Sequence, residues 1–262
     1  SNNTAVGKDA MLANTTGANN VAIGQNALET NTTASNNTAI GHRSLQTNAT
    51  GASNTAVGGA ALVSNTTGTQ NTSVGFESGL DITTAEAITV TGNSAGRQIT
   101  TGNGNTFFGS NAGCNVTTGN QNVAVGVNAG IDAVRDLTGS CTGNIVIGNN
   151  ASVAAYIKID WTVTSDLRDK TEIKNVKHGL DFVNQITPIE YKFKKSREDD
   201  TPTGVTRYGF KAQEILELEG DNPVIINNED TDNLKLTSAH LIPVLVNAIK
   251  ELKARIETLE NK

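Results

Sequence analysis

A glycine recurs every seventeen residues through the first half of this 262-residue chain, and this period constrains the fold more than any other feature. The series runs Gly7, Gly24, Gly41, Gly58, Gly75, Gly92, Gly109 and Gly126, and most members close a pentapeptide like Asn-Thr-Ala-Val-Gly. After a five-residue insertion, residues 144–148 repeat the pattern as Asn-Ile-Val-Ile-Gly. Self-similarity at a fixed period is typical of stacked coils, so the first half is predicted to be a shaft or head rather than a compact enzyme.

Charged residues divide the chain into two different objects. Residues 1–164 carry five Lys or Arg and eight Asp or Glu, whereas residues 165–262 carry fifteen and eighteen. The second composition is that of an ordinary globular domain. We therefore predict a β-repeat region over 1–150, a neck over 151–164 and a separate domain over 165–262.

The same composition argues against several classes of partner. The formal net charge is −6 with no basic stripe, which disfavours nucleic acid, and no apolar run has membrane length. Asp9, Asp81 and Asp132 lack the spacing of a repeated calcium site, so neither a metal nor a cofactor is predicted. Cys114 and Cys141 show no pairing pattern and are expected to be free thiols.

Each pentapeptide is predicted to form a short strand whose side chains alternate between two faces. The residues just before the glycines form an apolar column that we expect to be the core ladder: Val6, Ile23, Ile40, Val57, Val74, Thr91, Phe108, Val125 and Ile147. The opposite face carries mostly alanine, such as Ala22 and Ala39, and is expected to be where another chain approaches closely. Leu28, Leu45 and Leu62 are further core candidates. Nine coils at strand spacing would make a rod of about 40 Å.

The pentapeptide resembles the Ala-Ile-Gly repeat of trimeric adhesin heads and is similar to repeats in phage tail fibres. The resemblance covers about 150 residues and implies a parallel β-roll or β-helix that associates as a homotrimer. Its period is longer than in the adhesin heads. Each chain could therefore form its own roll, or three chains could wind together. A glycan or receptor on a host surface is a candidate ligand.

The second half opens with Ser-Asp-Leu-Arg-Asp-Lys-Thr-Glu-Ile at residues 165–173, the most specific motif of the chain. It resembles the start of the C-terminal intramolecular chaperone domain of phage tailspikes and tail fibres, the endosialidase-type peptidase family. Further matches lie at residues 180–193, at residues 208–214 and in a final helix from Leu241. The resemblance implies that the domain aligns three chains and then cuts itself off.

The resemblance also implies a serine–lysine catalytic dyad. Ser165 maps onto the nucleophile and Lys170 onto its general base, with the Ser165–Asp166 bond as the cleavage site. Arg168 and Glu172 are candidate supporting residues. Relatives usually carry an apolar residue where this chain has Asp169, and a carboxylate there would favour the protonated form of Lys170.

The spacing of the two dyad residues adds a constraint of its own. Residues five apart face opposite sides of a strand and lie about 140° apart on a helix. Ser165 and Lys170 can therefore meet only if a turn separates them, or if another chain supplies one of them.

The remaining pattern indicates an α+β domain that ends in a coiled-coil helix. We predict a helix over 180–186, hairpin strands over 189–193 and 207–210, a helical turn over 213–218 and a strand over 224–226. A coiled-coil helix follows over about 241–260, with Ile242, Ile249 and Ile256 at one heptad position and Leu245, Leu252 and Leu259 at the other. Ser238 is the expected N-cap, with Thr237 as the alternative, and Pro243 is expected in the first turn.

The function predicted from these features is that of a tail-fibre or tailspike segment, assembled in the host cytoplasm and carried on the virion. Identical coils can pair one coil out of step while keeping nearly every contact, so a unique trimeric domain is needed to set the alignment. The alternative is a structural fibre with a permanent, uncleaved trimerisation cap. A cell-surface adhesin head is a third interpretation.

Overall fold

The computed structural model describes residues 2–131, 136–149, 151–152, 165–194, 197–229 and 231–261. The chain divides into two compact units, Ser1–Ala155 and Tyr156–Lys262. Most of the predicted neck, residues 153–164, lies outside the described residues. None of the described helices is long and apolar enough to span a membrane.

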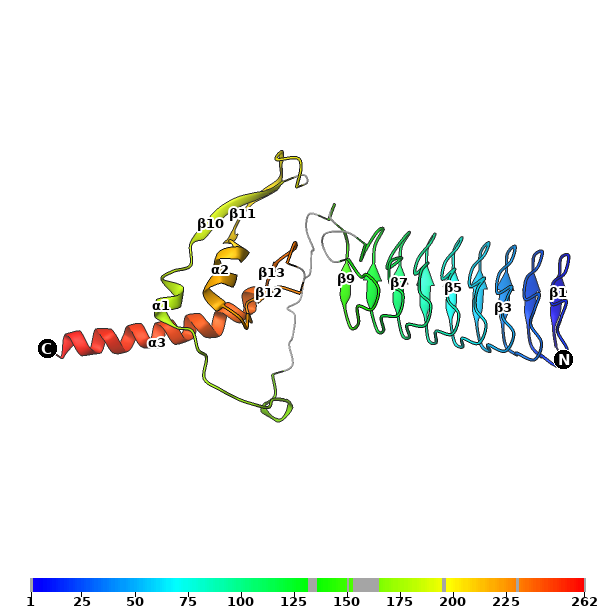
Figure 1. Ribbon diagram of the computed structural model, residues 1–262, viewed down its shortest axis with the longest axis horizontal. Helices are drawn as coiled ribbons and strands as arrows, with labels where there is room; N and C mark the ends of the chain where they lie inside the picture. Colours follow the sequence, from blue (N-terminus) through cyan, green and yellow to red (C-terminus); the bar gives the residue numbers. More distant parts are fainter. Residues whose placement is uncertain are drawn as a thin grey trace. The chain divides into compact units, whose positions relative to one another are not determined.

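The first unit is a β-solenoid that contributes one three-residue strand per coil to a single parallel sheet (Figure 1). The strands are β1 (Thr4–Val6), β2 (Val21–Ile23), β3 (Thr38–Ile40), β4 (Thr55–Val57), β5 (Thr72–Val74), β6 (Thr89–Thr91), β7 (Thr106–Phe108), β8 (Val123–Val125) and β9 (Ile145–Ile147). Each strand pairs only with its sequence neighbours, so the sheet order is the chain order. The predicted solenoid is confirmed.

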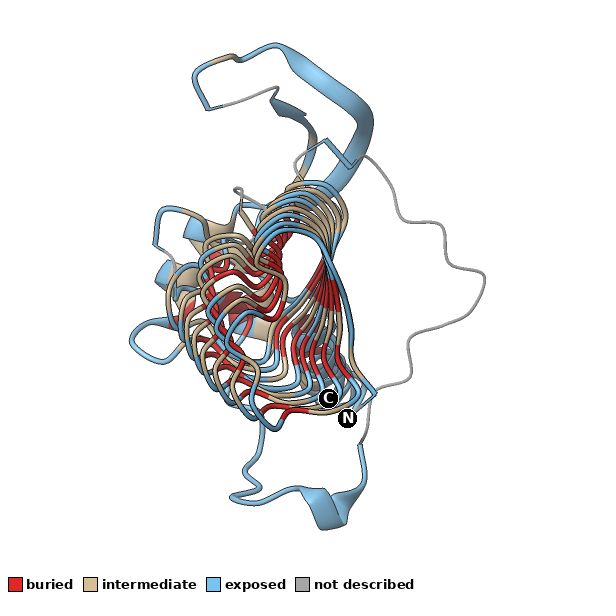
Figure 2. Ribbon diagram, turned by 90° about the vertical axis from the view of Figure 1, so that its right-hand side faces the viewer, coloured by how far each residue is buried: buried red, intermediate tan, exposed pale blue. Residues whose placement is uncertain are grey.

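One chain closes each coil by itself. Equivalent residues of successive coils pair directly, as in Thr38 with Thr55 and Ala39 with Ala56. Viewed along the stack, the coils lie one over another with buried residues lining the interior (Figure 2). The structure therefore favours a separate roll for each chain over three intertwined chains.

The two faces of the strands are reversed relative to the sequence-based expectation. Ala22, Ala39 and Ala56 are completely buried inside their own coil, and the small residues Ala27 and Ala61 are buried there too. The column predicted to be the core ladder points outward instead, and its members Ile23, Ile40, Val74, Phe108 and Val125 are each 37–43% exposed. The narrow coil explains the reversal in the early coils, whose interior has room only for a small side chain at the middle position of the strand; β6 and β7 bury the larger Val90 and Phe107 there. Leu28, Leu45 and Leu62 are fully buried, as predicted.

The glycine ladder marks the place where the backbones of neighbouring coils come closest. Gly24 has a φ of +132°, and a Cβ atom on it would lie 2.5 Å from the carbonyl oxygen of Gly41 in the next coil. Both the dihedral angle and the contact exclude an L side chain. The seventeen-residue period is therefore a backbone requirement that recurs in every coil.

The core changes composition halfway along the stack. Leu28, Leu45 and Leu62 occupy a left-handed position that later coils give to Gly79, Gly96 and Gly113. Larger residues elsewhere in those coils fill the vacated volume: a Cβ atom on Gly96 would lie 2.7 Å from Val90 Cγ1 and 2.8 Å from Ile99 Cδ1. The later coils thereby avoid leucine in a left-handed conformation while keeping the interior filled.

Buried asparagines hydrogen-bond successive coils to each other. The main ladder contains Asn20, Asn37, Asn54, Asn71, Asn105 and Asn122. Asn54 is typical, because its Nδ2 donates to Gly68 O at 2.8 Å and its Oδ1 accepts from Asn71 N at 3.0 Å. A second asparagine ladder ends at Asn65, because the next coil carries Ile82 at the equivalent position. Asn65 Oδ1 is therefore buried without a hydrogen-bond partner. The ladders satisfy backbone groups that a solenoid interior would otherwise leave unpaired.

Asn54→Ala is expected to destabilise the solenoid by about 2–4 kcal/mol, because the Asn71 amide and the Gly68 carbonyl both lose their buried partner. Asn93→Ala, a matched change at an exposed asparagine, should cost less than about 0.5 kcal/mol. Chemical denaturation followed by circular dichroism measures both. Equal effects of the two changes would contradict a stabilising role for the ladder.

The second unit is a small α+β domain. Its first described elements are a 3₁₀ turn, η1 (Leu167–Asp169), and helix α1 (Leu180–Val183), followed by the antiparallel hairpin β10 (Pro188–Lys194) and β11 (Pro202–Phe210). Helix α2 (Ala212–Glu219), the short pair β12 (Ile226–Asn227) and β13 (Lys235–Leu236), the 3₁₀ turn η2 (Ser238–His240) and helix α3 (Leu241–Glu260) complete it. Phe182, Ile215, Ile225, Ile226, Leu241 and Val244 form its core.

Two local predictions in this unit were wrong. The strand expected over 224–226 begins only at Ile226, because the amides of Val224 and Ile225 donate to the buried carboxylate of Glu219 at 2.7 and 2.8 Å instead of to a strand. Ser238 does not cap α3, since it lies in η2 and His240 occupies the cap position. Pro243 is the third residue of α3 and lies in its first turn, as predicted.

Candidate functional site

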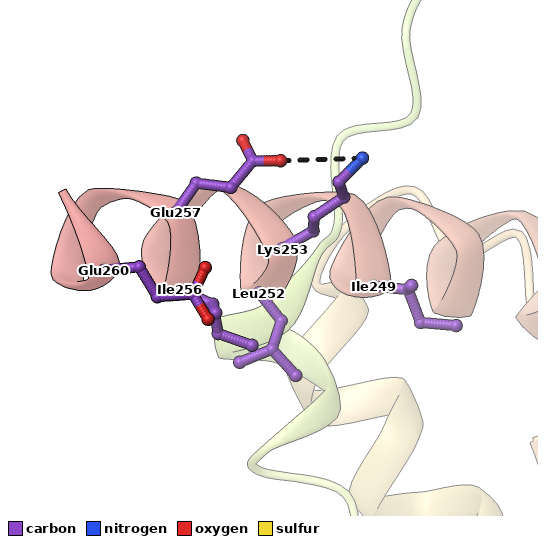
Figure 3. Close-up of a pocket in the computed structure, with 6 residues that line it drawn as sticks. All are labelled: Ile249, Leu252, Lys253, Ile256, Glu257 and Glu260. Carbon is purple, nitrogen blue, oxygen red and sulfur yellow. Dashed lines mark ion pairs between the residues drawn. The ribbon is translucent and has the colours of Figure 1, made fainter.

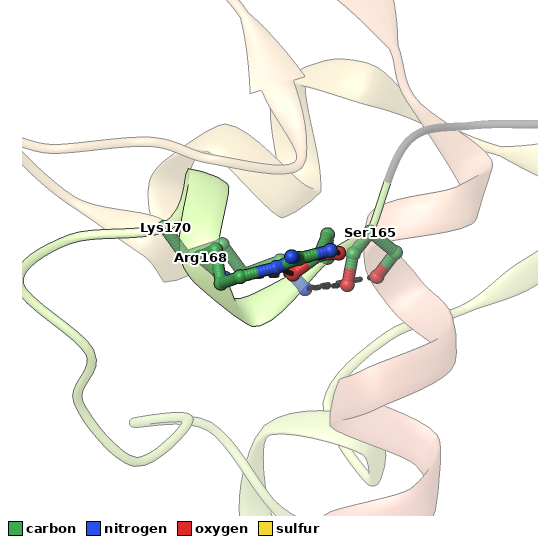
Figure 4. A network of polar contacts seen from close by, with 4 residues as sticks. Ser165, Arg168 and Lys170 are labelled. Atoms are coloured by element: carbon green, nitrogen blue, oxygen red, sulfur yellow. Dashed lines mark hydrogen bonds and ion pairs between the residues drawn. The ribbon is translucent and has the colours of Figure 1, made fainter.

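A short turn brings Ser165 and Lys170 together at the start of the second unit. Lys170 Nζ donates to Ser165 Oγ at 2.8 Å and to the Ser165 carbonyl oxygen at 3.1 Å. Between them lies η1, and the lysine side chain reaches back across it to the serine (Figure 4). The predicted turn is therefore present, and a single chain supplies both residues of the pair.

Asp166 and Arg168 define the conformation of that turn. Asp166 is the N-cap of η1, where its Oδ1 accepts from the Arg168 amide at 2.9 Å. The Arg168 guanidinium also pairs with the Asp166 carboxylate, with Nη2 and Oδ2 separated by 2.6 Å. The pKa of Asp166 is held below its usual range mainly by this side-chain contact with Arg168, and to a smaller extent by the hydrogen bond from the Arg168 amide. The Asp166 cap and the Arg168–Asp166 ion pair both lie within the turn that brings Lys170 to Ser165.

Asp169 and Glu172, which the sequence analysis also singled out, make no polar contact with the Ser165–Lys170 pair in the described residues. Within the described residues, no ion pair joins Asp169 to Lys170, and no hydrogen bond joins Glu172 to Ser165 or Lys170. Glu172 adopts a left-handed φ of 50° at the exit of the turn. Residues 165–172 are all exposed, so the described residues of the second unit leave the pair open to water.

Polar residues of α3 anchor the segment that follows the Ser165–Lys170 pair, and the sequence pattern did not predict them. Glu251 Oε2 accepts from the Leu180 amide at the start of α1 at 2.8 Å, and Asn247 Nδ2 donates to His178 O at 2.9 Å. Gly179 has no room for a side chain, since a Cβ atom there would lie 2.1 Å from Glu251 Oε1. Asn247 and Glu251 are four residues apart, so they share one helix face. Two polar residues four apart, Asn247 and Glu251, outside the apolar heptad positions of α3, were the only sequence sign of this contact.

The heptad face of α3 is largely exposed to solvent in the described part of the second unit. Leu241, Val244 and Ala248 are buried on the inner side of the helix, whereas Ile249, Leu252 and Ile256 are 67%, 46% and 46% exposed. These three side chains line a shallow groove together with Lys253, Glu257 and Glu260 (Figure 3). The helix therefore has two apolar faces, of which one packs against the core and the other is available to another chain.

Arg168→Gln should raise the pKa of Asp166 toward its ordinary value, because the guanidinium that favours the ionised carboxylate is removed. The Asp166 cap would then be lost at a higher pH as the solution is acidified. An NMR titration of the Asp166 side-chain carbon follows the change. Arg255→Gln, which removes a different Arg–Asp pair, should leave the titration of Asp166 where it was. An unchanged Asp166 titration in Arg168→Gln would contradict the assigned cause.

Comparison with known proteins assigns this segment. Residues 165–222 match the family model described as chaperone of endosialidase, a match that begins at the serine of the Ser165–Lys170 pair. Neither the curated proteins nor the solved structures give a significant match. A β-solenoid followed by a segment similar to the chaperone of endosialidase fits a tail fibre with a C-terminal chaperone domain.

Proposed function

We propose that this chain is part of a phage tail fibre or tailspike whose C-terminal unit brings three copies together and then releases itself by autoproteolysis next to Ser165. The observation that carries the proposal is the 2.8 Å contact between Lys170 Nζ and Ser165 Oγ, at the first residue of the family match. The predicted domain limits, 1–150, 151–164 and 165–262, are retained as part of the proposal. Host attachment through a glycan or protein receptor is the corresponding role of the mature solenoid.

Two apolar surfaces support association into a homotrimer, the assembly that the chaperone family implies. One is the heptad face of α3, where Ile242, Ile249 and Leu259 are each at least 60% exposed. The other is the outward face of the solenoid sheet, whose nine strands contain no charged residue. Aligned apolar surfaces of this kind are typical of interfaces between chains.

The Ser165–Lys170 pair has the chemistry of a serine protease that uses lysine as its base. The neutral Lys170 amine would remove the Ser165 hydroxyl proton as Oγ attacks a peptide carbonyl, and the resulting ammonium would protonate the leaving amine. An ester to Ser165 Oγ forms in that step. Water then hydrolyses the ester to a free carboxylate and restores the serine hydroxyl.

The bond that is cut depends on the chain to which the attacking oxygen belongs. Attack on the Ser165 carbonyl, which cleaves Ser165–Asp166, would close a strained four-membered ring if Oγ came from the same residue. Cleavage of Ser165–Asp166 therefore requires Ser165 of a neighbouring copy. Attack within one chain reaches the carbonyl of the preceding residue and cuts before Ser165.

Assembly of three copies would also shield Lys170 from water, whereas the described residues of the second unit leave it exposed. A lysine acts as a base at neutral pH only when its surroundings disfavour the ammonium form, and Lys170 is exposed here. Neighbouring copies that cover the Ser165–Lys170 pair would exclude water from it. Cleavage would then follow correct trimer formation, and release of the chaperone would make the assembly hard to reverse.

An intact-mass time course on the freshly expressed full chain tests this function, with static light scattering on the same sample. We expect a particle three times the 27.3 kDa chain mass and a progressive loss of the intact chain. Fragments of residues 1–165 and 166–262 indicate attack between copies, whereas fragments of 1–164 and 165–262 place the cut before Ser165, which a serine of the same chain can also make. A trimer that stays intact would instead support the permanent structural cap. A monomer would contradict both.

A further inference from the structure

The outward face of the solenoid sheet contains one interruption in an otherwise uniform surface. Most strands present either two aliphatic side chains or one aliphatic side chain and one threonine on this face. Strand β6 presents two threonines, Thr89 and Thr91, and β7 next to it presents Phe108, the one aromatic residue in its column. Thr91 pairs with Phe108 in the parallel register, so the polar strand and the aromatic strand are adjacent.

This face suits two further copies of the same chain better than an unrelated partner. Strands β1–β9 contain no charged residue, whereas Lys8, Glu29, Arg43, Glu77 and Arg97 of the same unit lie in the connecting turns. Identical copies can therefore meet along the strands without repulsion between like charges. The coils are spaced evenly, so parallel copies can bring equivalent strands to equal height.

We propose that Thr91 and Phe108 set the alignment of three copies along the solenoid, an inference that rests on the proposed trimer. In aligned copies, three Phe108 rings meet at one level and the Thr91 hydroxyls meet at the level below. A slip of one coil places the Thr91 hydroxyl of one copy against the Phe108 ring of another. That arrangement separates the aromatic rings and leaves the hydroxyls without partners.

Alignment by Thr91 and Phe108 would keep the copies in register after the C-terminal unit has been released. The other outward positions of β2–β5 alternate among Thr, Val and Ile, so neighbouring coils there are nearly interchangeable. Once the C-terminal unit has left, the solenoid must hold its own alignment. Thr91 and Phe108 lie in the coils nearer the C-terminal end of the stack, so chains that align from that end would meet them early.

Disulfide trapping between full-length copies tests the alignment. Copies carrying Val57→Cys and copies carrying Val74→Cys are mixed, refolded and oxidised, and the linked peptides are quantified by mass spectrometry. These positions lie in adjacent strands of one column. Aligned copies give 57–57 and 74–74 links, whereas copies slipped by one coil give the mixed 57–74 link, because disulfides form only between closely placed Cα atoms.

When Thr91 and Phe108 are both present, the mixed 57–74 link should be a minor product. The double change Thr91→Val with Phe108→Val makes the column uniform and should raise the mixed fraction about tenfold. Phe76→Val is the matched control, since Phe76 is 55% exposed in a turn outside the strands. It should leave the mixed fraction unchanged. Thr91→Val alone is a milder variant, with a smaller increase expected, for use if the double variant folds poorly.

Light scattering on each sample distinguishes a failure of trimer formation from a failure of the alignment role of Thr91 and Phe108. Trimers whose mixed fraction is the same in all variants would overturn the alignment role and leave the trimer standing. Trimers without any 57–57 or 74–74 link would place the outward face away from the contact between copies and would also overturn it. Monomers would overturn the proposed trimer and this inference together.

Discussion

Ser165→Ala is expected to keep the chain intact throughout an incubation in which the unmodified chain is cleaved next to residue 165. The change removes the only oxygen in the Ser165–Lys170 pair that can form an ester, while the Lys170 contact to the Ser165 carbonyl at 3.1 Å does not depend on the side chain. Loss of a nucleophile from such a unit removes about four or more orders of magnitude in rate. Intact-mass spectrometry should show no fragment.

Lys170→Met should abolish cleavage to the same extent, because Ser165 then lacks a base at hydrogen-bonding distance. Lys174→Met makes the same change at an exposed lysine four residues along the chain and should cleave normally. Ser238→Ala, in η2, is the matching control for the serine. Asp169→Leu should cleave at least as fast as the unmodified chain, because it removes the neighbouring carboxylate.

The outcomes distinguish a defect in chemistry from a defect in assembly. Ser165→Ala and Lys170→Met should both remain trimers by light scattering, since neither side chain belongs to the apolar faces of α3 or the solenoid. Cleavage that persists in Ser165→Ala would rule out Ser165 as the nucleophile. Cleavage that fails only in a variant that has become monomeric would point to assembly rather than to the Ser165–Lys170 pair.

Gly58→Ala is expected to destabilise the solenoid by at least about 4 kcal/mol, one of the largest effects for the removal or addition of a single methyl group. Gly58 has a φ of +135°, and the added Cβ atom would lie 2.3 Å from the carbonyl oxygen of Gly75. The contact is with backbone, so no side-chain rotation can relieve it. Neighbouring coils would have to separate, and their hydrogen bonds would break.

Gly59→Ala provides the control at the adjacent residue. Its added Cβ atom would meet the ring of Phe76 at 3.3 Å, and that exposed side chain can move. We expect a change of less than about 1 kcal/mol. Thermal unfolding followed by circular dichroism, in the Ser165→Ala background so that the chain length is constant, measures both. Similar unfolding midpoints for the two variants would contradict the backbone-contact explanation of the glycine ladder.

The repeat period was sufficient to predict the solenoid, because a backbone constraint that recurs in every coil leaves a fixed spacing in the sequence. The period does not tell which face of a three-residue strand is buried. Alanine and isoleucine both suit an interior, and the available volume decides between them. In this narrow coil Ala39 is enclosed and Ile40 is outside, the reverse of the ranking by hydrophobicity.

The spacing of Ser165 and Lys170 predicted either a turn between them or a residue supplied by another chain, and the structure has the turn. The cap by Asp166 and the pairing of Arg168 depend on which polar groups lie close in space, and sequence order carries little information about that. The anchoring of Leu180 by Glu251 spans 71 residues and is of the same kind.

The sequence by itself therefore determined the stacked coils, the division of the chain into two unlike halves and the heptad pattern of α3. Each of these depends on short-range spacing or on local backbone geometry. The tertiary structure decided that each chain closes its own coil, that the isoleucine and valine column points outward, and that the heptad face of α3 is largely exposed while its other face is buried. These outcomes depend on the volume enclosed and on which surfaces meet, and neither quantity is local in the chain.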